Sequence, residues 1–170
     1  MLKTSKILVT GAKGFLGKHV CKELRDKGYS NIIECANSND VSRSSDGCDC
    51  DRSYDVESDS LTSRCDLRNK TCVQSLIEHN NPDVVIHLAA KVGGIGANQE
   101  NPGAFIHDNL VMGINLIDAC KGSVDKFVLA GTVCSYPKYC SVPFEESQIW
   151  EGYPEETNAP YGIAKKTLTV

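Results

Sequence analysis

The chain has 170 residues and a formal net charge of −4, so it is long enough for one domain with a buried core. Hydrophobic residues make up 41% of it, and no apolar run approaches the ~20 residues of a membrane-spanning helix. No basic cluster indicates a nucleic acid or a membrane as partner. Residues 1–6 are too short and too polar for a signal peptide, which predicts a cytoplasmic protein.

The nine cysteines are an odd number, and without an export signal we expect reduced thiols. One set suggests zinc, namely Cys35, Cys48, Cys50 and Cys65. Its spacing matches none of the paired C-x-x-C patterns of zinc sites. We therefore predict no metal and keep zinc as the less favoured alternative.

The most informative stretch is residues 7–17, ILVTGAKGFLG. Its apolar start predicts a buried strand, and the helical spacing of the apolar residues that follow predicts a helix. Between them stand Gly11, Gly14 and Gly17. In a dinucleotide-binding turn the first glycine allows the tight turn, the second lets backbone N–H groups approach a pyrophosphate, and the third lets helix and strand pack closely. The phosphates then bind at the helix N-terminus; an ordinary strand–helix turn is the alternative.

Strands and helices alternate along the rest of the chain. Strands are expected at residues 7–10, 31–34, 83–88 and 126–130, and helices at 14–27, 69–79, 102–121 and from 160 to the chain end. Residues 91–97 and 131–158 are expected to be loops. The long helix is expected to bury one apolar stripe, formed by Ile106, Leu110, Ile114 and Ile117.

Residues 35–63 interrupt this pattern. They hold seven acidic residues against two arginines, together with eight serines and few large apolar side chains. Such a composition buries too little apolar surface to offset the entropy cost of ordering. We therefore expect an acidic insert that is a mobile surface loop, with room for a short strand near its end.

The alternation predicts the α/β class, a Rossmann-type doubly wound parallel sheet in one NAD(P)-binding domain over residues 1–170. Ligands of such sheets bind beyond the carboxyl ends of the strands. Three of these ends are the glycine turn, Leu88–Ala90 and Gly131–Thr132. We expect them to converge on one crevice.

Tyr161 and Lys165 are four residues apart on the last predicted helix, so they share one face. A tyrosine with a pKa of ~10 is a poor acid–base group at neutral pH. A nearby ammonium would lower that pKa and allow proton exchange with an alcohol or ketone. Thr132 stands at a strand end, where its hydroxyl can position the same substrate oxygen. The alternative is a solvated helix face.

Three distinctive runs lie at residues 89–98 (AAKVGGIGAN), 131–138 (GTVCSYPK) and 155–165 (EETNAPYGIAK). They resemble the extended short-chain dehydrogenases/reductases and, within these, the GDP-L-fucose synthase family. The resemblance covers about residues 5–34 and 64–168. It implies an NADP-dependent enzyme that epimerises and then reduces GDP-4-keto-6-deoxymannose to GDP-L-fucose, as a homodimer at full length.

The resemblance also implies roles by position. Tyr161 and Lys165 match the family's catalytic Tyr and Lys, and Thr132 stands at its Ser or Thr. Cys134 matches the cysteine that moves a proton during epimerisation, a step that suits a thiolate because a proton next to a ketone is acidic; a buried structural thiol is the alternative. The implied cofactor-binding residues are Gly11, Lys13, Gly14, Phe15, Leu16, Gly17, Asp66, Leu67, Leu88, Ala89, Ala90, Asn109, Tyr161 and Lys165. The implied substrate-binding residues are Val92, Gly93, Gly94, Asn98 and Lys138.

Two further points concern the choice between NADP and NAD and the length of the chain. Lys13 stands where the family has a basic residue near the ribose 2′-phosphate, which favours NADP, whereas Glu34 could bind a 2′-hydroxyl and favour NAD; we predict NADP. Family members are also much longer. We therefore expect a sheet truncated before its last strands, no substrate domain and no partner histidine, so that the chain is inactive alone.

Two other functions remain open. Another nucleotide-sugar epimerase or dehydratase would use Tyr161 and Lys165 but would not need Cys134. A non-catalytic nucleotide-binding module would need neither set of residues. A catalytic role of Cys134 would therefore distinguish the two kinds of enzyme. Any catalytic activity would exclude the non-catalytic module.

Overall fold

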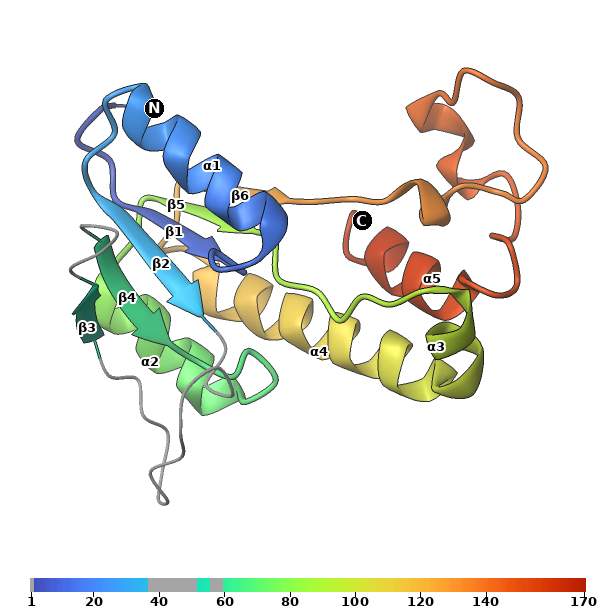
Figure 1. Ribbon diagram of the computed structural model, residues 1–170, viewed down its shortest axis with the longest axis horizontal. Coiled ribbons are helices and arrows are strands. Elements are labelled where there is room, and N and C mark those ends of the chain that lie inside the picture. The colour runs from blue at the N-terminus through green and yellow to red at the C-terminus, as the bar shows by residue number, and fades with distance from the viewer. Residues whose placement is uncertain (1, 37–51, 56–59) are drawn as a thin grey trace. The chain divides into compact units, whose positions relative to one another are not determined.

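The computed structural model describes residues 2–36, 52–55 and 60–170, and its elements are labelled in Figure 1. The chain divides into two compact units. The first comprises residues 1–89 and 114–129, and the second comprises residues 90–113 and 130–170. The first unit holds the sheet, and the second holds the helix that carries Tyr161.

The sheet has six strands in the order β3-β4-β2-β1-β5-β6. The strands are β1 (Ile7–Thr10), β2 (Ile32–Ala36), β3 (Arg52–Asp55), β4 (Ser60–Arg64), β5 (Val84–His87) and β6 (Lys126–Leu129). All neighbours pair in parallel except β3, which is antiparallel to β4. With β1 between β2 and β5, this is the order of a doubly wound sheet, so the predicted fold class is confirmed.

Local chemistry sets several helix ends. The helices are α1 (Phe15–Asp26), α2 (Lys70–Asn80), α3 (Ile95–Glu100), α4 (Pro102–Cys120) and α5 (Ala159–Thr167), with the 3-10 turns η2 (Val133–Ser135) and η3 (Glu146–Trp150). Gly28, with a φ of +81°, follows Lys27, the C-cap of α1. The Asn69 side chain caps α2 by accepting a hydrogen bond from the Cys72 amide at 3.1 Å, and Asn81 ends α2 in the left-handed conformation. Figure 1 shows α1 on one face of the sheet and α2 on the other.

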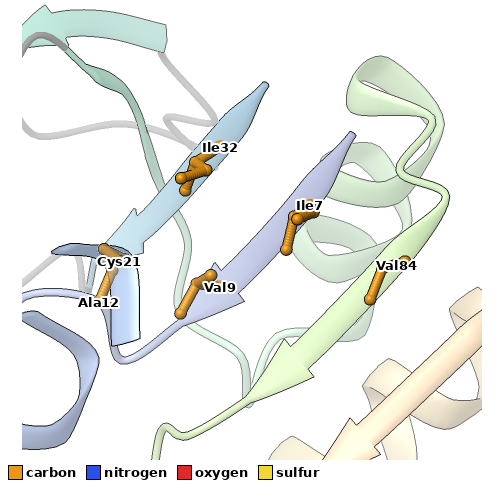
Figure 2. Packing of buried hydrophobic residues seen from close by; sticks show 6 residues of the cluster. All are labelled: Ile7, Val9, Ala12, Cys21, Ile32 and Val84. Carbon is orange, nitrogen blue, oxygen red and sulfur yellow. The ribbon is translucent and has the colours of Figure 1, made fainter. Parts of the chain in front are cut away.

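The core of the first unit centres on β1. Ile7 and Val9 have no exposed surface, and Figure 2 shows them beside Ile32 of β2, Val84 of β5 and Cys21 of α1. β-Branched side chains dominate these strands because both faces of a parallel sheet are covered. Each such side chain stabilises the fold by roughly 1.5–3 kcal/mol when fully buried. The strand that leads into the glycine turn is therefore fixed by packing.

The buried face of α4 differs from the predicted stripe. Ile114 and Ile117 are exposed. The buried positions are Phe105, Asn109, Gly113, Leu116 and Cys120. They recur every three or four residues, as an amphipathic helix requires, but with another phase. The apolar pattern predicts the wrong face because two of the buried positions, Asn109 and Gly113, are not apolar.

Several short elements were not predicted. β3 pairs with β4, α3 begins inside the segment expected as a loop at 91–97, and η2 and η3 lie within the one expected at 131–158. The last helix does not run to the chain end but stops at Thr167, with Leu168 as its C-cap. Elements this short show no periodicity that a sequence pattern could reveal.

The acidic insert contains a confirmed strand at its end. β4 pairs with β2 in register, Glu34 opposite Thr62 and Cys35 opposite Ser63. Thr62 and Ser63 are buried, so this end of the insert is not a surface loop. Residues 37–51 and 56–59 lie outside the described residues, and their mobility stays a prediction.

We expect that a short Gly–Ser linker in place of residues 37–51 leaves the fold intact, because that segment has few apolar side chains to bury. Extending the deletion through Arg64 removes β4 and the pairing of β2 on that side. The longer deletion should lower the melting temperature by ~10 °C or more, or abolish folding. Thermal melts followed by circular dichroism measure both; equal destabilisation by the two deletions would contradict the prediction.

Candidate functional site

The glycine turn of the first unit has the geometry that its spacing predicts. Gly11 has a φ of +69°, and a Cβ on it would lie 2.7 Å from the Ala89 nitrogen. A Cβ on Gly17 would lie only 2.1 Å from the Gly11 carbonyl oxygen and 2.6 Å from the Cα of Ala12. The first glycine therefore allows the turn, and the third lets α1 lie directly on the backbone of the turn.

The N-terminus of α1 is open. Gly14 is its N-cap, no side chain of the described residues caps the helix there, and its first turn holds no acidic residue. Phe15 is 85% exposed and Leu16 is more than half exposed. The unpaired amides and the helix dipole therefore present positive charge to solvent, the environment that a phosphate favours. This cradle fits the pyrophosphate of a dinucleotide.

The carboxyl end of β5 is bonded to the same turn. The amide of Leu88 donates to the Thr10 carbonyl at 3.2 Å, and the amide of Ala89 donates to the Thr10 hydroxyl at 3.3 Å. That hydroxyl also lies 2.7 Å from Nδ1 of the buried His87. These bonds place Leu88 and Ala89 beside the glycine turn, as two of the predicted strand ends require.

Asp66 and Leu67 follow β4 and occupy different environments. The Asp66 carboxylate accepts hydrogen bonds from Nε and Nη2 of Arg68 at 2.9 and 2.8 Å. Leu67 is buried, and its carbonyl accepts a hydrogen bond from the Asn115 side chain at 3.0 Å. The pair is thus held rigidly at the carboxyl end of β4. Its predicted contact with adenine stays a prediction.

Lys13 and Glu34, the residues that divide the cofactor prediction, form an ion pair. Nζ of Lys13 lies 3.1 Å from Oε2 of Glu34, and Nη2 of Arg25 lies 2.5 Å from Oε1. Burial acts to raise the pKa of Glu34, but the hydrogen bonds from Arg25 and Lys13 outweigh it, and the pKa lies below its usual value. Sequence reasoning missed Arg25, because only the fold brings α1 to the end of β2.

In the second unit, η2 and α5 bring together three of the four predicted catalytic residues, namely Thr132, Cys134 and Tyr161. The Thr132 hydroxyl caps η2 by accepting a hydrogen bond from the Cys134 amide at 3.2 Å. A Cβ on Gly162 would lie 2.0 Å from the Cys134 carbonyl oxygen, so α5 rests on η2 through the residue next to Tyr161. The buried Ser135 hydroxyl donates to the Gly162 carbonyl at 3.1 Å and fixes this contact.

The electrostatics of Tyr161 differ from the prediction. Burial and the neighbouring Cys134 raise the pKa of Tyr161, against a smaller lowering by the Thr132 hydroxyl. Lys165 is not among the causes, so the predicted lowering by its ammonium is wrong for this structure. Burial instead lowers the pKa of Lys165, which is 2% exposed. The phenol is therefore neutral at neutral pH, which is the form that donates a proton.

Asn109 is a positioning residue for the segment after β5. Its side chain exchanges two hydrogen bonds with the Lys91 backbone, each at 3.0 Å, and donates a third to the Phe105 carbonyl at 2.7 Å. Nζ of Lys91 in turn lies 3.0 Å from Oδ2 of Asp108. Asn109 is 2% exposed. Its amide thus holds Lys91 and the adjoining Ala90 in place, while its contact with a cofactor stays a prediction.

The predicted substrate residues fall into two kinds. Val92, Gly93 and Gly94 are exposed, so a ligand can reach them. Asn98 is buried, and its Nδ2 donates to the carbonyls of Gly93 and Gly94 at 3.3 and 3.2 Å. It therefore shapes the loop from beneath. Lys138 is exposed and lies 2.7 Å from a Glu156 carboxylate oxygen.

The structure thus assembles two groups of predicted residues, one in each unit. The first holds the glycine turn, Leu88 and Ala89; the second holds Thr132, Cys134 and Tyr161. Their convergence on one crevice spans the two units and stays a prediction. Sequence reasoning missed Gly162, although a glycine inside a helix signals a packing constraint.

Neither a metal-binding cluster nor a membrane-spanning helix is found among the residues that the structure describes. Among them, no group of three or more His, Cys, Asp or Glu side chains is arranged to hold a metal ion. Cys48 and Cys50 lie outside the described residues, which leaves the four-cysteine zinc alternative open. No helix of the described parts is long and apolar enough to cross a membrane.

Comparison with known proteins supports the resemblance seen in the sequence. The model of the NAD dependent epimerase/dehydratase family matches residues 7–169. The chain is 33% identical over 163 residues to the GDP-L-colitose synthase of Yersinia pseudotuberculosis, an alignment that covers 95% of this chain and 44% of that protein. It is 31% identical over 166 residues to the GDP-L-fucose synthase of Sinorhizobium fredii, covering 97% and 45%.

Solved structures give the same picture. A GDP-L-fucose synthetase from Naegleria fowleri bound to NADP matches with a TM-score of 0.74 and 26% identity, over 99% of this chain and 43% of that one. A UDP-glucose 4-epimerase from Thermotoga maritima matches with a TM-score of 0.73 and 26% identity, over 96% and 48%. The similarity to GDP-L-fucose synthases is confirmed, and the chain spans less than half the length of each of these relatives.

The glycine geometry predicts opposite effects for two matched substitutions. Gly14→Ala should change the free energy of unfolding by less than ~1 kcal/mol, because its Cβ would meet only the Gly11 carbonyl at 3.2 Å. It should weaken NADPH binding about tenfold by blocking the pyrophosphate. Gly17→Ala should destabilise the fold by about 1–3 kcal/mol, since its Cβ meets backbone. Urea unfolding and nucleotide titration measure both; unchanged NADPH binding by Gly14→Ala would contradict the cradle.

Gly162→Ala should separate α5 from η2. Its Cβ would overlap the Cys134 carbonyl, so we expect a loss of about 1–3 kcal/mol in the free energy of unfolding. Gly103→Ala is the matched control in the same unit, because a Cβ at Gly103 meets nothing within 4 Å. Urea unfolding of the two variants tests the contact; equal stabilities would show that α5 does not depend on it.

Proposed function

The chain belongs to the NAD dependent epimerase/dehydratase family, and we propose that it epimerises GDP-4-keto-6-deoxymannose and reduces it with NADPH to GDP-L-fucose. Relatives named GDP-L-fucose synthase support this substrate class. The observation that carries the proposal is the position of Cys134 beside Tyr161 and Thr132. This proximity supports assigning the removal of a proton from carbon to one of these groups and the donation of a proton to oxygen to another.

The cofactor proposed for this site is NADP. The open N-terminus of α1 and the glycine turn fit a pyrophosphate. Lys13 supplies a cation for a ribose 2′-phosphate, and the Naegleria fowleri relative was solved bound to NADP. Bound NADPH supplies the hydride for reduction of the ketone carbon.

Reduction also requires a proton at the ketone oxygen, and we assign it to Tyr161. Its phenol is neutral at neutral pH, and burial, which raises its pKa, favours that form further. It can therefore both donate a hydrogen bond to the ketone and release the proton as the oxygen becomes an alkoxide. Thr132 orients the phenol and the substrate oxygen. Lys165, on the same helix, does not lower the pKa of Tyr161 in this structure, and its role in the proposal is the cofactor contact that the resemblance implies.

Epimerisation moves protons at carbon and leaves the oxidation level unchanged. We assign the first proton to Cys134, whose thiolate would take it from the carbon next to the ketone while the electron pair moves onto the ketone oxygen. A proton delivered to the other face then completes the inversion, and the group that delivers it stays unassigned.

A second reading is favoured by one observation. The Thermotoga maritima neighbour is a UDP-glucose 4-epimerase, and an enzyme of that kind would use Tyr161 and Lys165 without a thiol. A non-catalytic nucleotide-binding module is the third reading.

The cytoplasmic location and the homodimer predicted from the sequence remain part of the proposal.

Two variants separate the chemical steps. Tyr161→Phe should lower NADPH oxidation by roughly 10²-fold or more, because the proton donor is lost, while solvent deuterium still enters the sugar ring. Cys134→Ser should do the reverse, suppressing deuterium uptake and retaining some reduction of the unepimerised ketone. The measurements are NADPH absorbance and mass spectrometry of the sugar in D2O, made on the longest natural form of the protein.

Undiminished deuterium uptake in Cys134→Ser would remove the thiol from the mechanism. It would return the chain to the simpler epimerase or dehydratase reading. Val133→Ala is a suitable control, because that side chain is on the same turn and 71% exposed. If the unmodified protein binds the nucleotide but catalyses neither NADPH oxidation nor deuterium uptake, the non-catalytic module would be favoured.

A further inference from the structure

Lys166 is a buried cation that the proposed reaction does not use. It follows Lys165 on α5 and is 5% exposed. Neighbouring residues of a helix point about 100° apart, so the two lysines have different surroundings. Nζ of Lys166 donates a hydrogen bond to the Gly152 carbonyl at 3.3 Å and lies 4.4 Å from the centroid of the Trp150 ring.

The partners of Lys166 are not carboxylates. Among the described residues it has no ion-pair partner, and its charge faces a carbonyl dipole and an indole ring. Tryptophan gives the strongest cation–π attraction of the aromatic side chains, and the attraction grows when the cation is desolvated. Trp150 itself is 57% exposed. The contact therefore holds a largely exposed ring, and the backbone that follows it, against α5.

The backbone that this contact holds lies beside the segment that carries Lys138. The Lys138 amide donates to the Tyr153 carbonyl at 2.9 Å, and Pro137 forms an antiparallel bridge with Pro154. Gly152 packs on the same segment, since a Cβ on it would lie 3.1 Å from the Pro137 Cβ. The position of the Lys138 backbone therefore depends on the backbone that the buried ammonium holds.

The chain from η2 to Gly152 is thus attached to α5 at both ends. The first attachment is the contact of Gly162 with η2, next to Tyr161. The second attachment is Lys166, further along the same helix. Lys138 lies between the two along the chain. Because both attachments are made to one helix, they fix the Lys138 backbone relative to the proposed proton donor.

We propose that Lys166 is a positioning residue for the nucleotide-sugar substrate and acts through Lys138. The resemblance places Lys138 at the sugar nucleotide, and 38% of its side chain is exposed. Lys166 is itself too buried to meet a substrate. A lysine on a fixed backbone loses less conformational freedom on binding, so losing the attachment weakens substrate binding. This inference rests on the proposed function, which takes a GDP-sugar as substrate.

Removing the charge of Lys166 tests the attachment. Lys166→Met keeps an apolar side chain but loses the ammonium, and we expect the dissociation constant of GDP-mannose to rise about tenfold. The dissociation constant of NADPH should change by less than about twofold, because the glycine turn lies in the first unit. Lys166→Arg keeps a cation that donates hydrogen bonds and stacks on aromatic rings, so it should bind GDP-mannose within about threefold of the unmodified protein.

Isothermal titration calorimetry of the longest natural form of the protein measures these constants. Lys121→Met, which removes an exposed lysine, controls for net charge and should leave both constants unchanged. Unchanged GDP-mannose binding in Lys166→Met would overturn the inference. Equal weakening of GDP-mannose and NADPH binding would also overturn it, because that result indicates a general loss of structure.

A double variant shows whether Lys166 acts through Lys138. Lys138→Met should weaken GDP-mannose binding about tenfold. Adding Lys166→Met should then weaken it by less than about twofold more, because coupled residues have non-additive effects. Fully additive weakening would overturn the inference. If Lys166→Met does not fold, Trp150→Leu replaces it in the same comparison, since it removes the ring and leaves the hydrogen bond to Gly152.

The same titrations separate this inference from the proposed function. GDP-mannose binding that is unchanged in Lys138→Met would overturn the inference alone. An unmodified protein that binds NADPH but not GDP-mannose would overturn the proposed substrate class and this inference with it.

Discussion

The first unit depends on one contact that only a residue without a side chain allows. At Gly17, α1 lies so close to the backbone of Gly11 and Ala12 that a Cβ would overlap it. This contact fixes the start of α1 at the end of β1, and β1 is fixed by the buried side chains of the sheet. The open helix terminus is thus held by packing and by the Gly14 amide, which donates to the Gly11 carbonyl at 3.0 Å. Binding a phosphate there requires little reorganisation.

The second unit repeats the device. Gly162 lets α5 rest on the Cys134 carbonyl, and Ser135 bonds across the contact. The same close packing desolvates Tyr161 and Lys165, which raises the pKa of the phenol and lowers that of the ammonium. Both shifts favour the neutral forms. The contact at Gly162 positions the helix that carries the proposed proton donor, and burial favours the neutral form of that donor.

Carboxylates pair with two of the three lysines predicted to meet a ligand, Lys13 with Glu34 and Lys138 with Glu156. Lys91, which was not among the predicted residues, pairs with Asp108. Such pairs restrict long flexible side chains, and they also reduce the charge that a phosphate meets. Lys165 differs, since no ion-pair partner is found for it among the described residues. The same contacts therefore hold a lysine side chain in position and reduce the positive charge that it presents to a ligand.

The sequence by itself determined the fold class and the glycine turn, because both depend on local spacing that backbone geometry makes specific. The grouping of Thr132, Cys134 and Tyr161 was implied by the resemblance to a known family and not by spacing along the chain. It did not determine the buried face of α4, where Asn109 and Gly113 replace apolar residues. Only the tertiary structure showed that Arg25 and Lys13 share Glu34 and that burial outweighs any effect of Lys165 on Tyr161. Ion pairs between distant segments and the desolvation of a side chain arise from packing in three dimensions, which no spacing along the chain encodes.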